Sequence, residues 1–235
     1  MNKPLLDSTV LYERYRVTLK IREKLFGGVP KNPDLIEAWV KARTGYDDEL
    51  TKAQTKEALE TQTEEIAAGS GMWTGFASDD VGIFLHTRNV KAMFRESSTL
   101  LGITQKKRGS KQIIQHGFEV KGCVVKNSKL ATSESHVYFM KDDNILAVPD
   151  GSEEGPIHVM TAQGPRTALK RQDFVEEAML AFDVWILKTE SAEKRHLGEK
   201  DLHHMLTHAQ ENGLGASRSQ GNGKFDVIEI SRLDK

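Results

Sequence analysis

The chain has 235 residues, of which 38% are hydrophobic and 29% are charged. This length fits one elaborated domain, and the hydrophobic content is enough for a sizeable core. The formal net charge is −1 and the pI is about 6.7, so the overall basic charge that usually marks a nucleic-acid-binding protein is missing. The same composition, without a long low-complexity run, excludes an intrinsically disordered chain.

The small net charge hides an uneven distribution of charged side chains. Residues 47–65 hold seven acidic side chains against two lysines, whereas residues 105–111 hold four basic side chains and no acidic one. Charge that is segregated in this way allows a local basic surface on a nearly neutral chain.

The cysteine content and the apolar segments exclude further classes of protein. Cys123 is the one cysteine, which rules out an internal disulfide framework and a cysteine-based zinc site, and its valine-rich surroundings indicate packing. Residues 1–7 lack the apolar region of a signal peptide, and no stretch approaches the roughly 20 apolar residues that span a bilayer. We therefore expect a cytoplasmic protein, of a cell or of an infected host cell, with no membrane partner.

Residues 10–22 are predicted to form the first strand, because their side chains alternate between apolar and basic with a period of two. One face carries Tyr15, Val17, Leu19 and Ile21. The other face carries Arg14, Arg16, Lys20 and Arg22. This second face is either a solvated surface or a basic surface that follows phosphate groups. The Gly-Gly-Val-Pro run at residues 27–30 ends the strand.

Helices are predicted at residues 33–44 and 48–67, and the weak apolar stripe of the second indicates a surface insertion at about residues 31–80. A short strand follows at residues 81–86. Residues 89–101 form the clearest amphipathic helix, which Gly102 is placed to end. Its expected buried stripe consists of Val90, Met93, Phe94, Ser97, Leu100 and Leu101.

The second half of the chain is predicted to be mostly strand. Strands fit residues 113–125, 130–140 and 145–148, and a projecting hairpin fits about residues 153–172. The last three elements are an apolar strand at residues 178–187, a helix at residues 199–212 that Gly213 ends, and a strand at residues 224–230.

This order of elements predicts an α+β fold: a ferredoxin-like (RRM-like) βαββαβ core with a helical insertion and a β-hairpin thumb, in one domain over residues 1–235. In such a fold both helices cover one face of the sheet, and the other face can stay open to a ligand.

A glycine-rich loop joins the last helix to the last strand. Its glycines are Gly213, Gly215, Gly221 and Gly223. Glycine allows positive φ angles and a close approach to a ligand, and consecutive amides can form an anion-binding nest. The loop is not a Walker A motif, because it follows a helix and lacks the G-x-x-x-x-G-K-[ST] pattern. A flexible connector is the alternative.

Three segments resemble a known family, the RAMP superfamily of CRISPR-associated RNA-binding proteins. Its glycine-rich loop is similar to GLGASRSQGNGKFDV, its first strand and turn are similar to YRVTLKIREKLFGGVP, and its first core helix is similar to residues 88–96. Together these segments cover about a sixth of the chain. The chain departs from relatives that cleave RNA with an aspartate after the first strand, because its nearest aspartate, Asp34, fits a helix N-cap.

The resemblance implies a non-catalytic protein that holds the phosphate backbone of RNA, or of another single-stranded nucleic acid, within a ribonucleoprotein or oligomer. The implied contacts are Arg14, Arg16, Lys20, Arg22, Lys91, Arg95, Lys106, Lys107, Arg108, Lys111, Arg166, Lys170, Arg218 and Lys224. Two alternatives stay open. One is a metal-independent endoribonuclease that uses His86. The other is a protein–protein assembly factor that retains the RAMP-like fold, and such a factor could also be encoded by a virus.

We expect neither a metal nor a cofactor. His204 and His208 have the i, i+4 spacing of a helical metal site, but we expect both to point to solvent, without a third ligand. Trp73 and Trp185 are aromatic side chains on which bases could stack, and for Trp185 the surrounding apolar strand favours burial.

Overall fold

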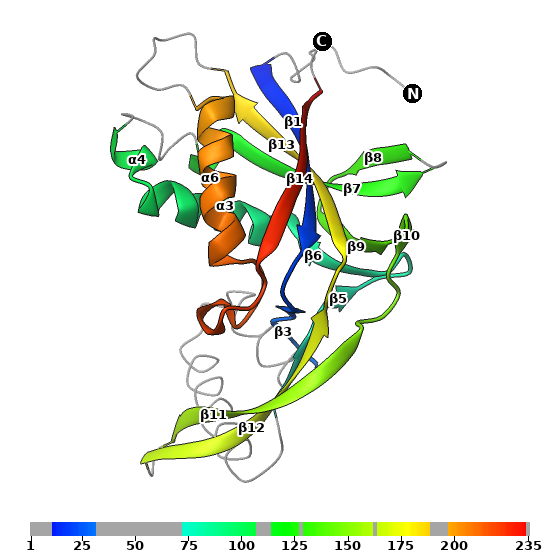
Figure 1. Ribbon diagram of the computed structural model, residues 1–235, viewed down its shortest axis with the longest axis vertical. Coiled ribbons are helices and arrows are strands. Elements are labelled where there is room, and N and C mark those ends of the chain that lie inside the picture. The colour runs from blue at the N-terminus through cyan, green and yellow to red at the C-terminus, as the bar shows by residue number, and fades with distance from the viewer. Residues whose placement is uncertain are drawn as a thin grey trace, which may run out of the picture. The chain divides into compact units, whose positions relative to one another are not determined.

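The computed structural model of the chain (Figure 1) describes residues 11–31, 72–106, 114–126, 129–161, 164–188 and 197–233. The helices expected at residues 33–44 and 48–67 lie outside these ranges, and so does most of the basic loop. The chain divides into two compact units, which we describe separately. The first comprises Met1–Leu25, Ala77–Val148 and Glu176–Lys235, and the second comprises Phe26–Phe76 and Pro149–Val175.

The first unit is built on an antiparallel sheet. Strand β1 (Tyr12–Ile21) pairs with β14 (Phe225–Arg232) on one side and with β13 (Met179–Leu187) on the other. β13 in turn pairs with β7 (Phe118–Lys126) and, at its beginning, with β9 (His136–Lys141). Shorter strands extend this unit: β5 (Ala77–Ser78), β6 (Ile83–His86), β8 (Lys129–Ser133) and β10 (Asn144–Ile145).

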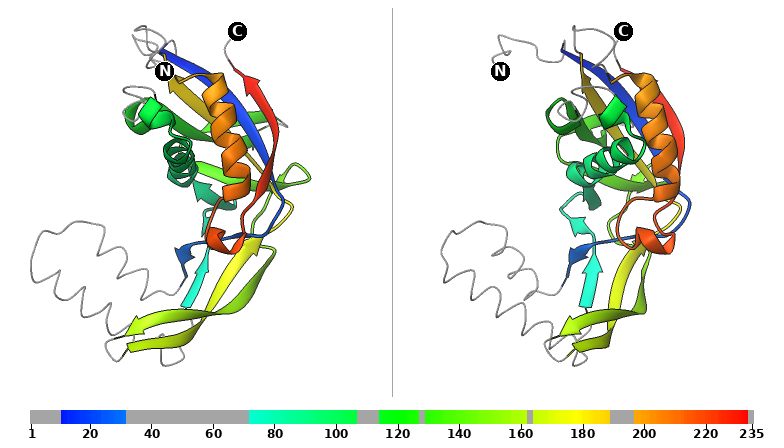
Figure 2. Two further views of the ribbon diagram at one scale, coloured as in Figure 1. Left: turned by 60° about the vertical axis from the view of Figure 1, so that its left-hand side comes forward. Right: turned by 90° about the vertical axis from the view of Figure 1, so that its left-hand side faces the viewer.

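Two helices complete the ferredoxin-like pattern. Helix α3 (Thr87–Leu100) lies in the chain between β1 and β7, which flank β13, and α6 (Glu199–Asn212) lies between β13 and β14, which flank β1. Figure 2 shows both helices on the same side of the sheet. This strand order and placement are those of two interleaved β-α-β units, so the α+β, ferredoxin-like fold expected from the sequence is confirmed. The short helix α4 (Ile103–Lys106) follows α3, and a 3₁₀ turn, η2 (Arg218–Gln220), precedes β14.

The core lies between the helices and the apolar face of β1 and β13. Tyr15, Val17, Leu19 and Ile21 are all at most 1% exposed, as their period of two predicts. On α3, Phe94 packs with its ring centroid 5.0 Å from that of Phe118 on β7. The buried stripe of α3 extends to Ser97 and Ser98 but does not include Leu100, which is 64% exposed and was expected to be buried. Gly102, with φ of 66°, ends α3 in the left-handed conformation.

The second unit contains β3 (Val29–Pro30), β4 (Met72–Gly75), β11 (Gly151–Thr161) and β12 (Gly164–Val175), while β2 (Leu25–Phe26) falls at the boundary of the units. β11 and β12 pair antiparallel along their whole length and form the predicted hairpin. β12 also pairs with β4 in parallel, and β4 pairs with β3.

The face of the first sheet that lies away from the helices is organised around a buried ion pair. Arg16 donates from Nε to Oδ1 of Asp183 at 2.8 Å and from Nη2 to Oδ2 at 3.0 Å. Asp183 is 0% exposed and also accepts hydrogen bonds from Thr132 Oγ1 at 2.8 Å and Cys123 Sγ at 3.4 Å. This contact joins β1 to β13 and to the β7–β8 pair. Burial, with Asp183 close by, raises the pKa of Cys123 to about 12, so the thiol is a packed group.

We expect Asp183→Ala to lower the free energy of unfolding by about 3 kcal/mol, because it leaves the Arg16 guanidinium largely buried without its counter-charge. Urea unfolding followed by circular dichroism measures this loss. The matched control is Asp226→Ala, which removes an exposed partner of Arg22 and should cost less than about 1 kcal/mol. Equal losses for the two variants would contradict a special role for the buried pair.

Candidate nucleic-acid interface

Trp185 lies on the sheet face away from the helices, surrounded by cations. Lys121 Nζ is 4.5 Å and Arg14 Cζ is 5.7 Å from its ring centroid, distances at which a cation interacts with the π system. The Tyr12 ring lies 5.8 Å away, tilted by 52°. The cluster of Tyr12, Arg14, Lys121 and Trp185, which we call the Trp185 cluster, draws on β1, β13 and β7. Such a surface offers both positive charge and an aromatic plane.

The sequence interpretation favoured burial for Trp185. In the structure Trp185 is partly buried, Nε1 included, and its side chain lies on the polar face of the sheet. The alternation of side chains along β13, with a period of two, predicts the face on which Trp185 lies. Val184 and Ile186 face the helices, so Trp185 must share the face of Asp183 and, across the strand pair, of Arg14.

Two of the predicted cations meet at the C-terminal end of α6. Arg22 Nη2 lies 2.6 Å from Glu211 Oε1, and Lys224 Nζ lies 3.2 Å from Glu211 Oε2. Arg22 also lies 3.3 Å from Asp226. The hydrogen bonds from Arg22 and Lys224 lower the pKa of Glu211, so this carboxylate stays charged and offsets the two cations.

Arg218 ties the glycine-rich loop to α3. Its Nη1 donates to Glu96 Oε2 at 2.7 Å, and this hydrogen bond lowers the pKa of Glu96. On the same helix, Lys91 lies 3.8 Å from Glu119. The structure therefore pairs several predicted phosphate contacts with carboxylates. Lys20 and Arg95, by contrast, are exposed and have no side-chain partner within the described ranges.

The backbone of the glycine-rich loop closes on itself. The amide of Leu214 donates to the Gly223 carbonyl at 2.9 Å, and the amide of Gly223 donates to the Lys24 carbonyl at 2.8 Å. A Cβ on Gly223 would come within 1.9 Å of the Leu214 oxygen, and one on Gly213 would come within 2.5 Å of the Asn222 oxygen. Only glycine fits at these two positions, because the backbone at the two ends of the loop lies too close to leave room for a Cβ atom. The amides of residues 213, 214, 220, 221 and 223 bond within the protein and are not available to an anion nest.

The remaining predicted cations belong to the second unit or lack a described side chain. Lys170 lies on β12, where burial lowers its pKa. Next to it, Arg171 lies 4.8 Å above the Trp73 ring, whose Nε1 donates to Asp173 at 2.8 Å. Trp73 is 38% exposed, so this unit has a cation–aromatic contact of its own. The side chains of Lys106 and Arg166 lie outside the described part, and so do the residues Lys107, Arg108 and Lys111.

His86 belongs to a cluster of titratable groups that the sequence did not reveal. It lies opposite His136 in the β6–β9 pair, with the two imidazole centroids 5.9 Å apart. His136 Nδ1 lies 3.1 Å from Oδ2 of Asp79, which also accepts a hydrogen bond from the Tyr138 hydroxyl at 2.7 Å. Because Asp79 approaches Nδ1, the proton of His136 is held there and Nε2 is left for other partners.

The surroundings of this cluster lower the pKa values of His86 and Asp79. Burial, followed by the charges of Arg88 and His136, lowers the pKa of His86, which favours the neutral imidazole. Burial opposes ionisation of Asp79, but hydrogen bonds from Tyr138, Gly82 and Val81 outweigh it and lower the pKa of this carboxyl. The result is a neutral histidine beside one that a carboxylate orients.

One of the two helical histidines does not lie as expected: His204 is exposed, whereas His208 is not. We expected His204 and His208 to point outward, but His208 is partly buried and its Nδ1 lies 3.1 Å from Ser97 Oγ on α3. The reason is that α3 packs beside α6 and covers that side of it. Among the described residues, no group of three or more His, Cys, Asp or Glu side chains could hold a metal ion. No described helix is long and apolar enough to cross a membrane.

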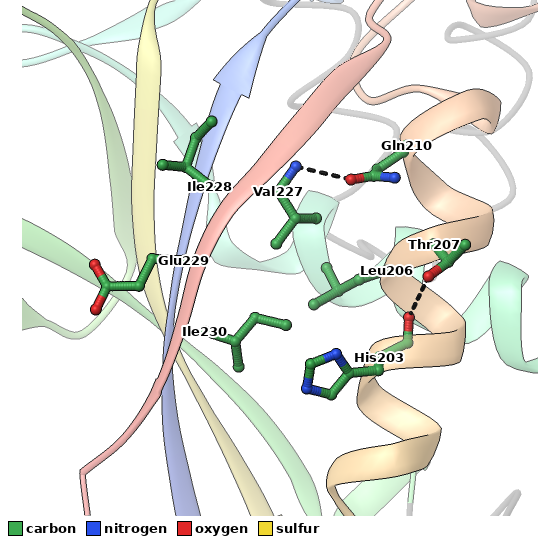
Figure 3. Close-up of a pocket in the computed structure, with 8 residues that line it drawn as sticks. All are labelled: His203, Leu206, Thr207, Gln210, Val227, Ile228, Glu229 and Ile230. Atoms are coloured by element: carbon green, nitrogen blue, oxygen red, sulfur yellow. Dashed lines mark hydrogen bonds between the residues drawn. The ribbon is translucent and has the colours of Figure 1, made fainter.

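A groove of about 290 Å³ lies between α6 and β14 (Figure 3). Its lining is mixed: Leu206, Val227, Ile228 and Ile230 are aliphatic, and His203, Thr207, Gln210 and Glu229 are polar or charged. In the groove the amide of Val227 donates to Gln210 Oε1 at 2.8 Å. The Thr207 hydroxyl in the lining donates to the backbone carbonyl of His203 at 2.9 Å, and we assign no chemistry to this groove.

Comparison with known proteins gives a likeness of fold. No protein-family model and no curated sequence matches the chain. Among solved structures, the chain resembles one chain of the cryo-EM structure of the Type III-B Cmr-beta complex bound to cognate target RNA. The match has a TM-score of 0.50 and 11% sequence identity, and it covers 96% of this chain and 62% of the other. This chain therefore spans less than two thirds of the length of that neighbour.

We expect Gly223→Ala to destabilise the protein more than Gly221→Ala. Both glycines have positive φ, which costs alanine about 1–2 kcal/mol, but only at Gly223 does the new Cβ strike the backbone. That clash adds roughly 1–3 kcal/mol. Urea unfolding of the two variants measures the difference, and equal losses would show that the loop does not need its close backbone contact.

Proposed function

We propose that the chain is a non-catalytic RNA-binding protein of RAMP type that acts as a subunit of a ribonucleoprotein. The observation that carries this proposal is the Trp185 cluster, which gathers Lys121, Arg14 and two aromatic rings on the sheet face that the helices leave uncovered. The fold that the chain shares with a subunit of an RNA-bound Cmr complex supports it. Protein partners of the kind found in that complex belong to the same proposal.

The proposed contacts are electrostatic and independent of base sequence. Arg and Lys side chains hold phosphate oxygens, and release of bound counterions makes the affinity depend on salt. We place Lys20 and Lys121 first, because Lys20 is exposed and Lys121 is held by a ring and an exposed carboxylate, and we add Arg14, which lies over the same ring. Arg95, exposed on α3, is a separate proposed contact on the helix side. Arg16 is left out, because its guanidinium holds Asp183. The glycine-loop cations Arg218 and Lys224 contribute only where RNA displaces Glu96 and Glu211.

Fluorescence polarisation with a labelled single-stranded RNA tests this proposal. We expect Lys121→Glu and Arg14→Glu each to weaken binding about tenfold and to reduce the slope of log K against log salt by about 0.7 per lost phosphate contact. The matched control is Lys200→Glu, which makes the same charge change at an exposed site on α6.

Binding that is unchanged between about 50 mM and 200 mM salt would contradict the electrostatic mechanism. If the chain binds no single strand at low salt and elutes as a defined oligomer free of nucleic acid, the function is protein–protein assembly.

One observation favours a second candidate function, a metal-independent endoribonuclease: His86 and His136 lie side by side, and Asp79 orients the latter. In this reaction His86 takes the proton of a ribose 2′-hydroxyl, and the 2′-oxygen attacks phosphorus. The bond from phosphorus to the 5′-oxygen breaks, and protonated His136 gives its proton to that oxygen. The products are a 2′,3′-cyclic phosphate and a 5′-hydroxyl.

Incubation of RNA with the protein in EDTA tests the second candidate. We expect His86→Ala and His136→Ala each to reduce cleavage at least 100-fold, whereas His204→Ala on α6 should leave it unchanged. Because the pKa of His86 lies below its ordinary value, cleavage should decrease as the pH falls through that lowered pKa. A DNA strand of the same sequence should stay intact, since it lacks the 2′-hydroxyl. Intact RNA in EDTA would remove this candidate.

A further inference from the structure

The Trp185 side chain has a property that packing alone does not explain. Its Nε1 is buried and has no hydrogen-bond partner among the described residues. An indole N–H that is buried without an acceptor is unfavourable. A phenylalanine would pack against Tyr12 without that penalty, so the larger ring of tryptophan points to a use of its π surface.

Carboxylates offset part of the positive charge around the ring. Lys121 lies 3.9 Å from Glu134, whose side chain is 90% exposed, and Glu119, which is opposite Trp185 in the β13–β7 pair, lies 3.8 Å from Lys91 of α3. Exposed pairs of this kind are weak, so Lys121 can leave both Glu134 and the ring at little cost. Because the positive charge of this face is partly offset, we expect the aromatic plane to add to what the cations contribute to ligand binding.

We propose that Trp185, backed by Tyr12, is a stacking platform for one unpaired nucleobase, with Lys121 and Arg14 turning from the ring to the phosphates on either side of that base. This inference rests on the proposed RNA binding and names the part of the ligand that the site recognises. A base that stacks on the indole replaces Lys121 there, and the ammonium gains a phosphate partner. Every base has a π face, so the platform accepts any base that is unpaired.

Fluorescence of Trp185 tests the platform directly. The chain has three tryptophans, at positions 39, 73 and 185, so Trp39→Phe combined with Trp73→Phe leaves Trp185 as the sole indole. We expect hexauridylate to quench this fluorescence on binding. An abasic hexamer with the same phosphates should bind about tenfold more weakly and leave the fluorescence unchanged. Quenching by hexathymidylate as well would also support the platform and would extend it to single-stranded DNA.

Substitutions of Trp185 supply the second arm of the test. Trp185→Leu should weaken hexauridylate binding about tenfold and leave binding of the abasic hexamer unchanged, whereas Trp185→Phe should keep most of the affinity. The matched control is Leu100→Ala, which truncates an exposed apolar side chain on α3 and should leave both affinities unchanged. The quenching measurement uses the native Trp185, so it decides the question even if Trp185→Leu does not fold.

The outcomes separate the two proposals. If hexauridylate and the abasic hexamer bind equally and Trp185 is not quenched, the stacking platform is wrong while RNA binding stands. If neither oligomer binds at low salt, both proposals fail.

Discussion

The bidentate contact between Arg16 and Asp183 sets the architecture of the sheet. It joins the two central strands at their middle, on the face that has no helix to cover it. Through Thr132 and Cys123 it also fixes the β7–β8 pair against β13. A carboxylate with no exposed surface needs such partners, because an unpaired charge there would disfavour folding strongly. The same contact positions Trp185 two residues further along β13, so the candidate interface depends on it.

The ion pairs also explain how a nearly neutral chain can resemble proteins that hold RNA. Glu96 and Glu211 neutralise the cations of the glycine-rich loop, so the loop resembles an RNA-binding element in sequence while carrying little net field. Lys121, near Trp185, is held by the aromatic ring and by an exposed carboxylate, which are weaker partners. The difference moves the proposed contact surface from the loop, where the family resemblance places it, to the open face of the sheet.

The sequence was sufficient to predict the elements that have strong periodicity. The period of two in β1 and the apolar alternation of β13 predicted the buried face, and α6 has the same bounds as the helix predicted from its stripe. Pairings between distant residues were beyond sequence reasoning, because nothing local links Arg16 to Asp183, Arg218 to Glu96, or His136 to Asp79. Trp185 is only partly buried, and the alternation along β13 already indicated that its side chain shares the face of Asp183. The strand expected at residues 130–140 proved to be two, β8 and β9, with Glu134 and Ser135 between them.

The hydrogen bond from the Val227 amide to Gln210 has a consequence for how copies of this chain can meet. β14 stands at the end of the strand order in its sheet, and the outer edge of such a strand is a template onto which another chain can add by backbone pairing. Here a side chain from the neighbouring helix already satisfies one of the amides of that strand. A second chain that added itself as a continuation of the sheet would have to displace Gln210 first.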